Sequence, residues 1–141
     1  MASKFHQSFF HPNNPKKYVG KGSIKMRSSW ETTFAMFCDN DPNVLEWASE
    51  SIRIPYFNPL TRKKTTYVPD FLVRYKDARG KEVVELVEIK PYKQSVFEGR
   101  QNQKQKEVVA VNHAKWKAAQ MFCKAKGIQF RVVTEKELYR K

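Results

Sequence analysis

Residues 67–91 read YVPDFLVRYKDARGKEVVELVEIKP, two apolar runs on either side of a polar segment. The first run, Tyr67 to Tyr75, and the second, Glu82 to Lys90, are rich in the β-branched and aromatic residues that strands favour. Residues 76–81 between them are polar and include a glycine, as is typical of a tight turn. The pattern therefore predicts a hairpin of two antiparallel strands.

Alternation of side chains along a strand sorts the second run into two faces. One face receives Val84, Leu86, Glu88 and Lys90, and the other receives Val83, Glu85, Val87 and Ile89. Glu88 and Lys90 are therefore expected side by side at the end of the second strand. The hairpin should bring Asp70, at the start of the first strand, close to both.

Two acids and a lysine at the end of a sheet are the groups that metal-dependent phosphodiester hydrolysis needs. Carboxylate oxygens bind a hard cation, usually Mg²⁺, which keeps several waters for the substrate. The lysine can orient or help deprotonate the attacking water, or stabilise charge on the phosphate. The order Pro69-Asp70, seventeen further residues, then Glu88-Ile89-Lys90 resembles the PD-(D/E)xK signature of restriction-endonuclease-like nucleases.

Composition and charge indicate one domain with a polyanionic partner. The chain has 141 residues, 13% of them aromatic, and a formal charge of +13. Basic residues gather in residues 1–27 and 91–126, on either side of a nearly neutral middle that holds the acids of the hairpin. We interpret this charge as a nucleic-acid-binding property, because no basic amphipathic helix with a broad apolar face indicates a membrane surface. A surface that is basic only for solubility is the alternative.

Cysteine usage and the absence of leader sequences limit the remaining classes. Cys38 and Cys123 are far apart and lack neighbouring Cys or His, so neither a disulfide framework nor a zinc site is expected. No signal peptide or apolar run of transmembrane length is present, so we expect a soluble protein of a reducing compartment. Without a glycine-rich phosphate loop, no nucleotide cofactor is expected.

Residues 1–27 carry six lysines and arginines, no acid, and no helical or strand periodicity. We therefore divide the chain into an extended basic N-terminal arm, residues 1–27, and a nuclease domain, residues 28–141. Aromatic side chains of the arm could dock on a neighbouring surface while its lysines contact phosphates. A tail that is disordered when the protein is alone is the alternative.

A helix is predicted to begin after Ser28, since aromatic residues recur at helical spacing from Trp30 onwards, and to stop at Asp41. Glu31 in its first turn has two interpretations. Ser28 and Glu31 form a capping-box pattern, in which the glutamate bonds back to the helix start. Many nucleases of this fold class also carry an acid on the helix before the sheet, so Glu31 is equally a candidate metal ligand.

The remaining segments alternate between strands and helices. Short strands are predicted over residues 44–47, 51–56 and 128–133, a basic turn over residues 58–64, and a long helix over residues 101–126 that ends at Gly127. The apolar side of that helix is expected to carry Val108, Val111, Ala114 or Lys115, Ala118 and Phe122. This order predicts an α/β fold with a mixed central sheet flanked by helices.

Four segments resemble the N-terminal endonuclease domain of Tn7-type transposition nucleases, which implies the restriction-endonuclease-like fold. They are Ser28-Ser29-Trp30-Glu31, Pro69-Asp70-Phe71, Glu88-Ile89-Lys90-Pro91 and residues 127–134. With Tyr18-Val19-Gly20 and Phe37-Cys38-Asp39 in addition, the chain is more similar still to the small head-completion nucleases of tailed myoviruses. The resemblance extends over about residues 12–137.

The resemblance implies a Mg²⁺-dependent DNA endonuclease, with Mn²⁺ able to substitute, that acts late in phage head assembly. It would process the packaged DNA end or prepare the portal vertex for joining of the neck and tail. Its implied partners besides DNA are portal, neck or capsid proteins. Its implied location is the virion head or neck, and the host cytoplasm during assembly.

Residue roles follow from the same resemblance. The implied metal ligands are Glu31, Asp70, Glu88 and the backbone carbonyl of Ile89, and the three acids together with Lys90 are the implied catalytic residues. Glu88 departs from the transposition nucleases, which have glutamine there, but glutamate fits the wider signature and is a better metal ligand. Phosphate contacts are expected from the basic residues just beyond the second strand: Lys93, Arg100, Lys104 and Lys106.

Two other functions are compatible with the sequence. A nuclease fold could serve as a DNA-binding structural component of the neck or portal vertex without turnover, or the chain could be a transposition or repair endonuclease. The joint presence of all four catalytic residues argues against the inactive fold, which would need none of them.

Overall fold

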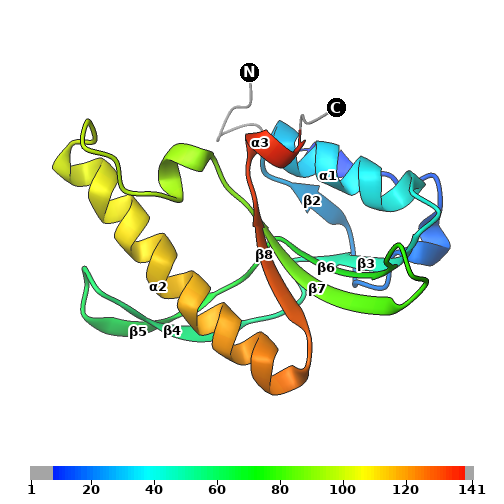
Figure 1. The fold of residues 1–141 in the computed structure, drawn as a ribbon. Coiled ribbons are helices and arrows are strands. Elements are labelled where there is room, and N and C mark those ends of the chain that lie inside the picture. The colour runs from blue at the N-terminus through cyan, green and yellow to red at the C-terminus, as the bar shows by residue number, and fades with distance from the viewer. Residues whose placement is uncertain (1–7, 139–141) are drawn as a thin grey trace.

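The computed structural model describes residues 8–138 and has a mixed α/β fold (Figure 1). Its central sheet has the order β3-β6-β7-β8 and consists of β3 (Val44–Ser49), β6 (Phe71–Lys76), β7 (Glu82–Ile89) and β8 (Gln129–Val133). β6 is antiparallel to both of its neighbours, whereas β7 and β8 are parallel. The prediction of a mixed central sheet is therefore confirmed.

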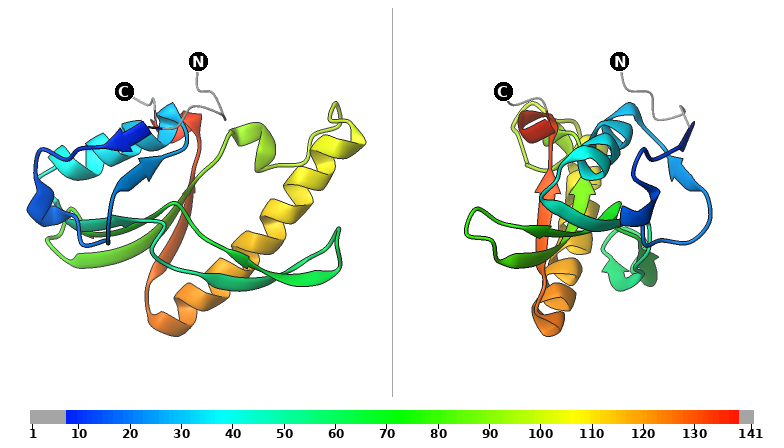
Figure 2. Two further views of the ribbon diagram at one scale, coloured as in Figure 1. Left: turned by 180° about the vertical axis from the view of Figure 1, so that it is seen from behind. Right: turned by 90° about the vertical axis from the view of Figure 1, so that its right-hand side faces the viewer.

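Helices and two small antiparallel ribbons surround the sheet. They are α1 (Ser29–Asn40), α2 (Gln103–Lys126), α3 (Glu135–Leu138), the 3-10 turns η1 (Pro15–Lys17) and η2 (Tyr92–Gln94), the ribbon of β1 (Ser8–Phe10) with β2 (Ile24–Met26), and the ribbon of β4 (Ile54–Asn58) with β5 (Lys63–Tyr67). The β4–β5 ribbon runs beside α2, apart from the central sheet (Figure 2). No helix within residues 8–138 is long and apolar enough to cross a membrane.

The predicted hairpin is confirmed as β6 and β7. Its turn is held by the Asp77 carboxylate, whose Oδ1 accepts hydrogen bonds from the backbone N–H groups of Arg79 (2.9 Å) and Lys81 (3.0 Å). Gly80 lies in this turn at φ +78°, a conformation that other residues adopt only with strain. Local turn chemistry therefore fixes the register that brings the two strand ends together.

The first strand of the hairpin is shorter than predicted. Tyr67 ends β5, and residues 68–70 form a break before β6 begins. Pro69, which has no N–H to donate to a sheet, lies in the middle of that break. The carbonyl of Asp70 instead accepts a hydrogen bond from the N–H of Glu50 (3.0 Å), which ties the break to the end of β3. Asp70 thus lies in a fixed bend ahead of β6.

Two apolar cores lie on opposite faces of the central sheet. α1 and the β1–β2 ribbon cover the first core, and α2 and the β4–β5 ribbon cover the second. β7 contributes Val87 and Ile89 to the first core and Leu86 to the second, which confirms the predicted alternation. The end of β7 is therefore enclosed from both sides.

The buried face of α2 differs from the predicted one. Its buried residues are Val109, Asn112, Trp116, Ala119 and Cys123. The predicted apolar stripe was wrong by one position, because apolar residues surround much of this helix and the large Trp116 side chain determines which of them face the sheet. Val108, expected inside, is 39% exposed. Val111, Ala114, Ala118 and Phe122 pack at the edge of the second core, where they are half-buried.

The N-terminal segment is more ordered than the predicted extended arm. From Ser8 onwards it forms the β1–β2 ribbon, which buries Ile24 and Met26 in the first core. Phe10 and Tyr18 pack edge-on against the Trp47 ring, with centroid distances of 5.7 and 4.8 Å. Residues 8–27 thus pack on the domain through contacts that are too distant in sequence to produce a periodic pattern. Residues 1–7 of the predicted arm lie outside the described residues.

A buried carboxylate of α1 anchors this N-terminal segment. Asp39 is 1% exposed, and its two oxygens accept hydrogen bonds from the backbone N–H groups of Asn13 (2.7 Å) and Asn14 (2.9 Å). The Lys17 ammonium donates to the carbonyls of Asp39 (2.9 Å) and Asp41 (2.8 Å). The end of α1 thus provides the acceptors that hold residues 13–17 in place.

Replacing Asp39 should therefore loosen the N-terminal segment. We expect Asp39→Ala to lower the free energy of unfolding by about 2–4 kcal/mol, because two backbone N–H groups lose a buried, charged acceptor. Urea denaturation of the variant against wild type measures this loss. Glu98→Ala, which removes an exposed carboxylate from a loop, is the control and should leave the midpoint unchanged. Equal stability of Asp39→Ala and wild type would show that these hydrogen bonds do not anchor the segment.

Candidate active site

Asp70 lies against the end of β7 through a single short contact. Its Oδ2 accepts a hydrogen bond of 2.7 Å from the backbone N–H of Ile89. The bend at Pro69 directs the Asp70 side chain to this N–H, which the strand itself leaves free. The structure thus brings Asp70 to the Glu88-Ile89-Lys90 segment, as the hairpin predicted.

Glu88 is the most enclosed acid of this group. Glu88 is 3% exposed, and its Oε2 lies 3.8 Å from the Lys90 ammonium. Its Oε1 is buried and has no hydrogen-bond partner among the described residues. Desolvation raises the pKa of Glu88. Desolvation, followed by the charge of Glu88, raises the pKa of Asp70 well above its ordinary value. The two carboxylates therefore lie close enough for the charge of Glu88 to disfavour ionisation of Asp70.

Two further polar atoms next to Glu88 also lack partners in the described part of the chain. They are the hydroxyl of Tyr67 and the indole Nε1 of Trp116, both buried. Burial, and then the charge of Glu88, raises the pKa of Tyr67, so the phenol stays protonated. Buried polar atoms are nearly always paired, and a group of unpaired ones indicates a site that a ligand or ion completes.

Glu31 caps α1 and also faces Asp70. Ser28 Oγ accepts a hydrogen bond of 3.2 Å from the Glu31 N–H, and the Glu31 carboxylate accepts from the Arg27 N–H (3.3 Å) and from Ser28 Oγ (3.3 Å). The predicted capping role is therefore confirmed. Burial, followed by the charge of Asp70, raises the pKa of Glu31 to about 7. The side chain lies within the electrostatic field of the Asp70–Glu88 pair while it caps the helix.

These acids do not form a ready-made metal cage. Over residues 8–138, no three His, Cys, Asp or Glu side chains converge as a metal site. Asp70 and Glu88 are nevertheless suited to a cation: their oxygens are hard donors, their raised pKa values show a shortage of positive charge, and Glu88 Oε1 has no partner. The group fits a divalent cation that draws the carboxylates together when it binds.

Lys115 is a residue of this site that the sequence analysis missed as a functional group. It lies at mid-length in α2 and is half-buried, with its ammonium 5.7 Å from the centroid of the Tyr67 ring and 6.0 Å from that of Tyr56. Burial, and then the charge of Lys90, lowers the pKa of Lys115. Its position beside Trp116 would have been the signal, had the buried face of the helix been assigned correctly.

The four predicted phosphate-contacting residues are exposed. Lys93 lies in η2, Arg100 in the loop that follows, and Lys104 and Lys106 in the first turns of α2. The Gln101 amide donates to the Lys93 carbonyl (2.8 Å) and so holds η2 against the loop. The tip of the β4–β5 ribbon adds a second exposed basic group, made of Arg62, Lys63 and Lys64.

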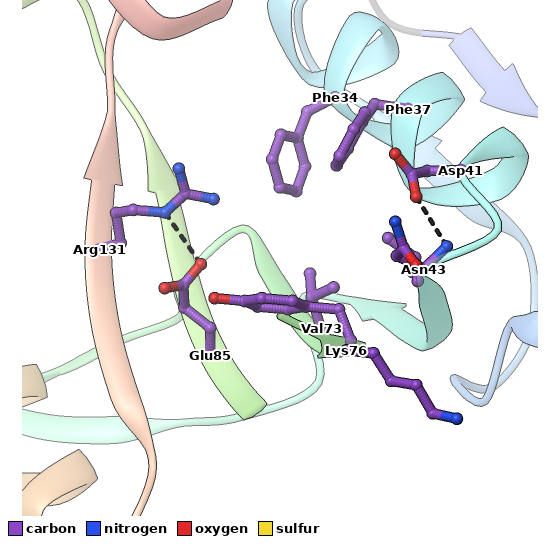
Figure 3. Close-up of a pocket in the computed structure, with 10 residues that line it drawn as sticks. Phe34, Phe37, Asp41, Asn43, Val73, Lys76, Glu85 and Arg131 are labelled. Atoms are coloured by element: carbon purple, nitrogen blue, oxygen red, sulfur yellow. Dashed lines mark hydrogen bonds and ion pairs between the residues drawn. The ribbon is translucent and has the colours of Figure 1, made fainter. Parts of the chain in front are cut away.

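A pocket of about 410 Å³ lies elsewhere, between α1 and the far ends of β6 and β7 (Figure 3). Phe34 and Phe37 line one side, and Arg131 of β8 lies opposite them, paired with Glu85 of the adjacent strand β7 at 2.9 Å. Glu85 is 5% exposed, so this ion pair compensates a buried charge. The pocket includes none of the acids at the end of β7.

Comparison with known proteins places this geometry in context. Residues 41–135 match the protein family described as TnsA-like endonuclease N terminal, and the match includes Asp70, Glu88 and Lys90 but begins after Glu31. A head completion nuclease of Enterobacteria phage T4 is 36% identical over 135 residues, which cover 88% of this chain and 87% of that relative.

The raised pKa of Glu31 makes stability depend on pH. Its carboxyl favours the folded state when protonated, so this contribution is complete below pH 4.5 and is lost as the pH rises through about 7. Glutamine keeps one oxygen that can accept the hydrogen bond from the Arg27 N–H and is neutral at every pH. In metal-free buffer we therefore expect Glu31→Gln to be more stable than wild type above pH 7, and the difference to shrink toward pH 4.5.

Urea midpoints of both proteins across this pH range measure the effect. Glu98→Gln is the control, because it removes the same charge from an exposed loop. The difference between its urea midpoint and that of wild type should not vary with pH. A wild-type protein that is at least as stable as Glu31→Gln above pH 7 contradicts the expectation.

Proposed function

The chain belongs to the family of TnsA-like endonucleases, and we propose that it cuts DNA in a divalent-metal-dependent reaction at the end of β7. One observation carries this proposal: half-buried Asp70 and buried Glu88 lie close together at the end of β7. The Lys90 ammonium lies beside them, 3.8 Å from Glu88 Oε2. Burial raises the pKa of both carboxyl groups, and the charge of Glu88 raises that of Asp70 further, so a bound cation would favour their ionised forms. Mg²⁺ is the cation that we propose, with Mn²⁺ able to substitute.

The finer fold assignment follows from the order of elements around this site. α1 precedes the sheet, Asp70 lies just before the first strand of the β6–β7 hairpin and Glu88 on its second, and α2 leads to the parallel strand β8. This order supports a restriction-endonuclease-like fold. In such a fold the hairpin positions the acids, and the two helices close the faces of the sheet around them.

Asp70, Glu88 and the carbonyl of Ile89 are the proposed metal ligands. Glu31 joins them if binding of the cation draws its carboxylate away from the helix start. When bound, the cation supplies a Lewis acid and neutralises charge on the scissile phosphate. Lys90 would orient the attacking water and stabilise charge on the phosphate, roles that its ammonium beside Glu88 permits.

DNA binding is assigned to the exposed basic residues around α2. Lys93 and Arg100 lie shortly after Lys90 in sequence, so a duplex that reaches the acids can contact them through its phosphates. Lys104 and Lys106 extend the same basic region along α2. Such contacts position DNA without reading its sequence.

The biological setting is proposed from the relative named above. Because that relative is a head completion nuclease, we assign this chain to phage head completion, where it processes the packaged DNA end or prepares the head for joining of the neck and tail. Portal, neck or capsid proteins are then its partners. Its proposed location is the virion head or neck, and the host cytoplasm during assembly.

Cleavage of linear and supercoiled DNA with Mg²⁺ or Mn²⁺ tests the activity. We expect wild type to cut, EDTA to stop the reaction, and both Asp70→Ala and Lys90→Ala to lower the rate by at least about 100-fold, since each removes a group that acts on the reacting atoms. Lys124→Ala, at the far end of α2, is the control and should cut like wild type. A wild type that binds DNA but never cuts would favour a structural DNA-binding role. Activity that survives both substitutions would mean that the site lies elsewhere.

The salt dependence of DNA binding tests the basic surface. Replacing Lys93, Arg100, Lys104 and Lys106 by glutamine, singly and together, should lower the slope of log K against log salt by about 0.9 for each lost phosphate contact on duplex DNA. Filter binding or fluorescence anisotropy at several salt concentrations gives this slope. Lys124→Gln should leave it unchanged. A fourfold variant with the wild-type slope would remove these residues from the DNA path.

A further inference from the structure

Lys115 is a cation without a counterion at the end of β7. Among residues 8–138, no ion pair or hydrogen bond involves its ammonium, although the side chain is half-buried. It lies over the Tyr67 ring at 5.7 Å and near the Tyr56 ring at 6.0 Å, and both tyrosines are buried. Aromatic faces attract a cation only weakly, so they hold the ammonium in place without neutralising it.

The charges around Lys115 show where it lies in the site. Lys90, Glu88 and Asp70 all act on its ammonium, in that order of strength. Glu88 alternates with Ile89 along β7 and so shares the face of Leu86, which packs in the core under α2. Lys115 therefore enters the site from α2 on the Glu88 face of the sheet, whereas α1 covers the opposite face.

A divalent cation on the acids would change the charge balance. Asp70 and Glu88 together carry two negative charges, which the cation would neutralise, so Lys90 and Lys115 would both be left without compensation. Burial and the charge of Lys90 already lower the pKa of Lys115, as expected for an ammonium that lacks an anion. A phosphate group is the anion that a DNA-cleaving site brings to this place.

We propose that Lys115 binds a DNA phosphate next to the scissile bond, on the α2 side of the acids. This inference rests on the proposed endonuclease function and adds a second phosphate-binding lysine, supplied by a different element from Lys90. The rings of Tyr56 and Tyr67 lie close to the ammonium, so it is positioned before DNA arrives. Lys117, two residues further along α2, is exposed and should take no part.

Three substitutions separate this role from a structural one. Lys115→Met removes the charge but keeps an apolar stem on the tyrosines, Lys115→Arg keeps the charge, and Lys115→Gln is a second neutral variant if the methionine variant folds poorly. Lys117→Met is the matched control on the same helix. For each protein we would measure thermal unfolding, kcat and KM for DNA cleavage with Mg²⁺, and the salt slope of DNA binding with Ca²⁺ in place of Mg²⁺.

The expected result is a loss of phosphate binding in a folded protein. Both neutral variants should lower kcat/KM by about 10- to 100-fold, as for a lost hydrogen bond to a charged group, while Lys115→Arg retains most of the activity. The salt slope should fall by about 0.9 in the neutral variants and stay unchanged in Lys117→Met.

Two results would overturn the inference. Neutral variants that cleave and bind like wild type would show that Lys115 does not touch DNA. Neutral variants that lose thermal stability and activity together, with the wild-type salt slope, would assign Lys115 to packing alone. The endonuclease proposal itself is judged separately, by wild-type cleavage and its loss in Asp70→Ala.

Discussion

The hydrogen bond from the Ile89 N–H to the Asp70 carboxylate, 2.7 Å long, joins the two strands that make the site. It holds Asp70 close to Glu88, in a place where desolvation and the second charge both oppose ionisation. Burial of like charges destabilises a folded protein unless something compensates them. The remainder of the structure can be understood as the scaffold that keeps these groups together.

That scaffold acts from both faces of the sheet. The first core, under α1, fixes Val87 and Ile89 on one side of β7, and the second core, under α2, fixes Leu86 on the other. The same helices also bring charged groups to the site, Glu31 from the start of α1 and Lys115 from the middle of α2. Packing and chemistry are thus coupled, because a shift of either helix would move a charged group relative to Asp70 and Glu88.

The hairpin and its acids were predictable from sequence because their geometry is local. Strand alternation and a glycine-containing turn determine where Asp70, Glu88 and Lys90 lie, and the family resemblance extended this prediction to Glu31. The role of Lys115 was not predictable, because it depends on the rotation of α2 about its axis. The predicted apolar stripe offered Ala114 or Lys115 at one position, but it did not show that Lys115 faces Tyr56 and Tyr67. The packing of residues 8–27 was not predictable for a related reason, since Phe10 and Tyr18 pack on Trp47, a residue distant in sequence.

Cation binding by the Asp70–Glu88 pair is the central claim, and titration calorimetry with Mn²⁺ tests it most directly. Wild type should bind the ion with release of protons, because ligation requires ionised carboxylates and burial raises the pKa of both groups. Asp70→Asn and Glu88→Gln should each abolish both the binding and the proton release. Binding of equal affinity in wild type and both variants would contradict the account.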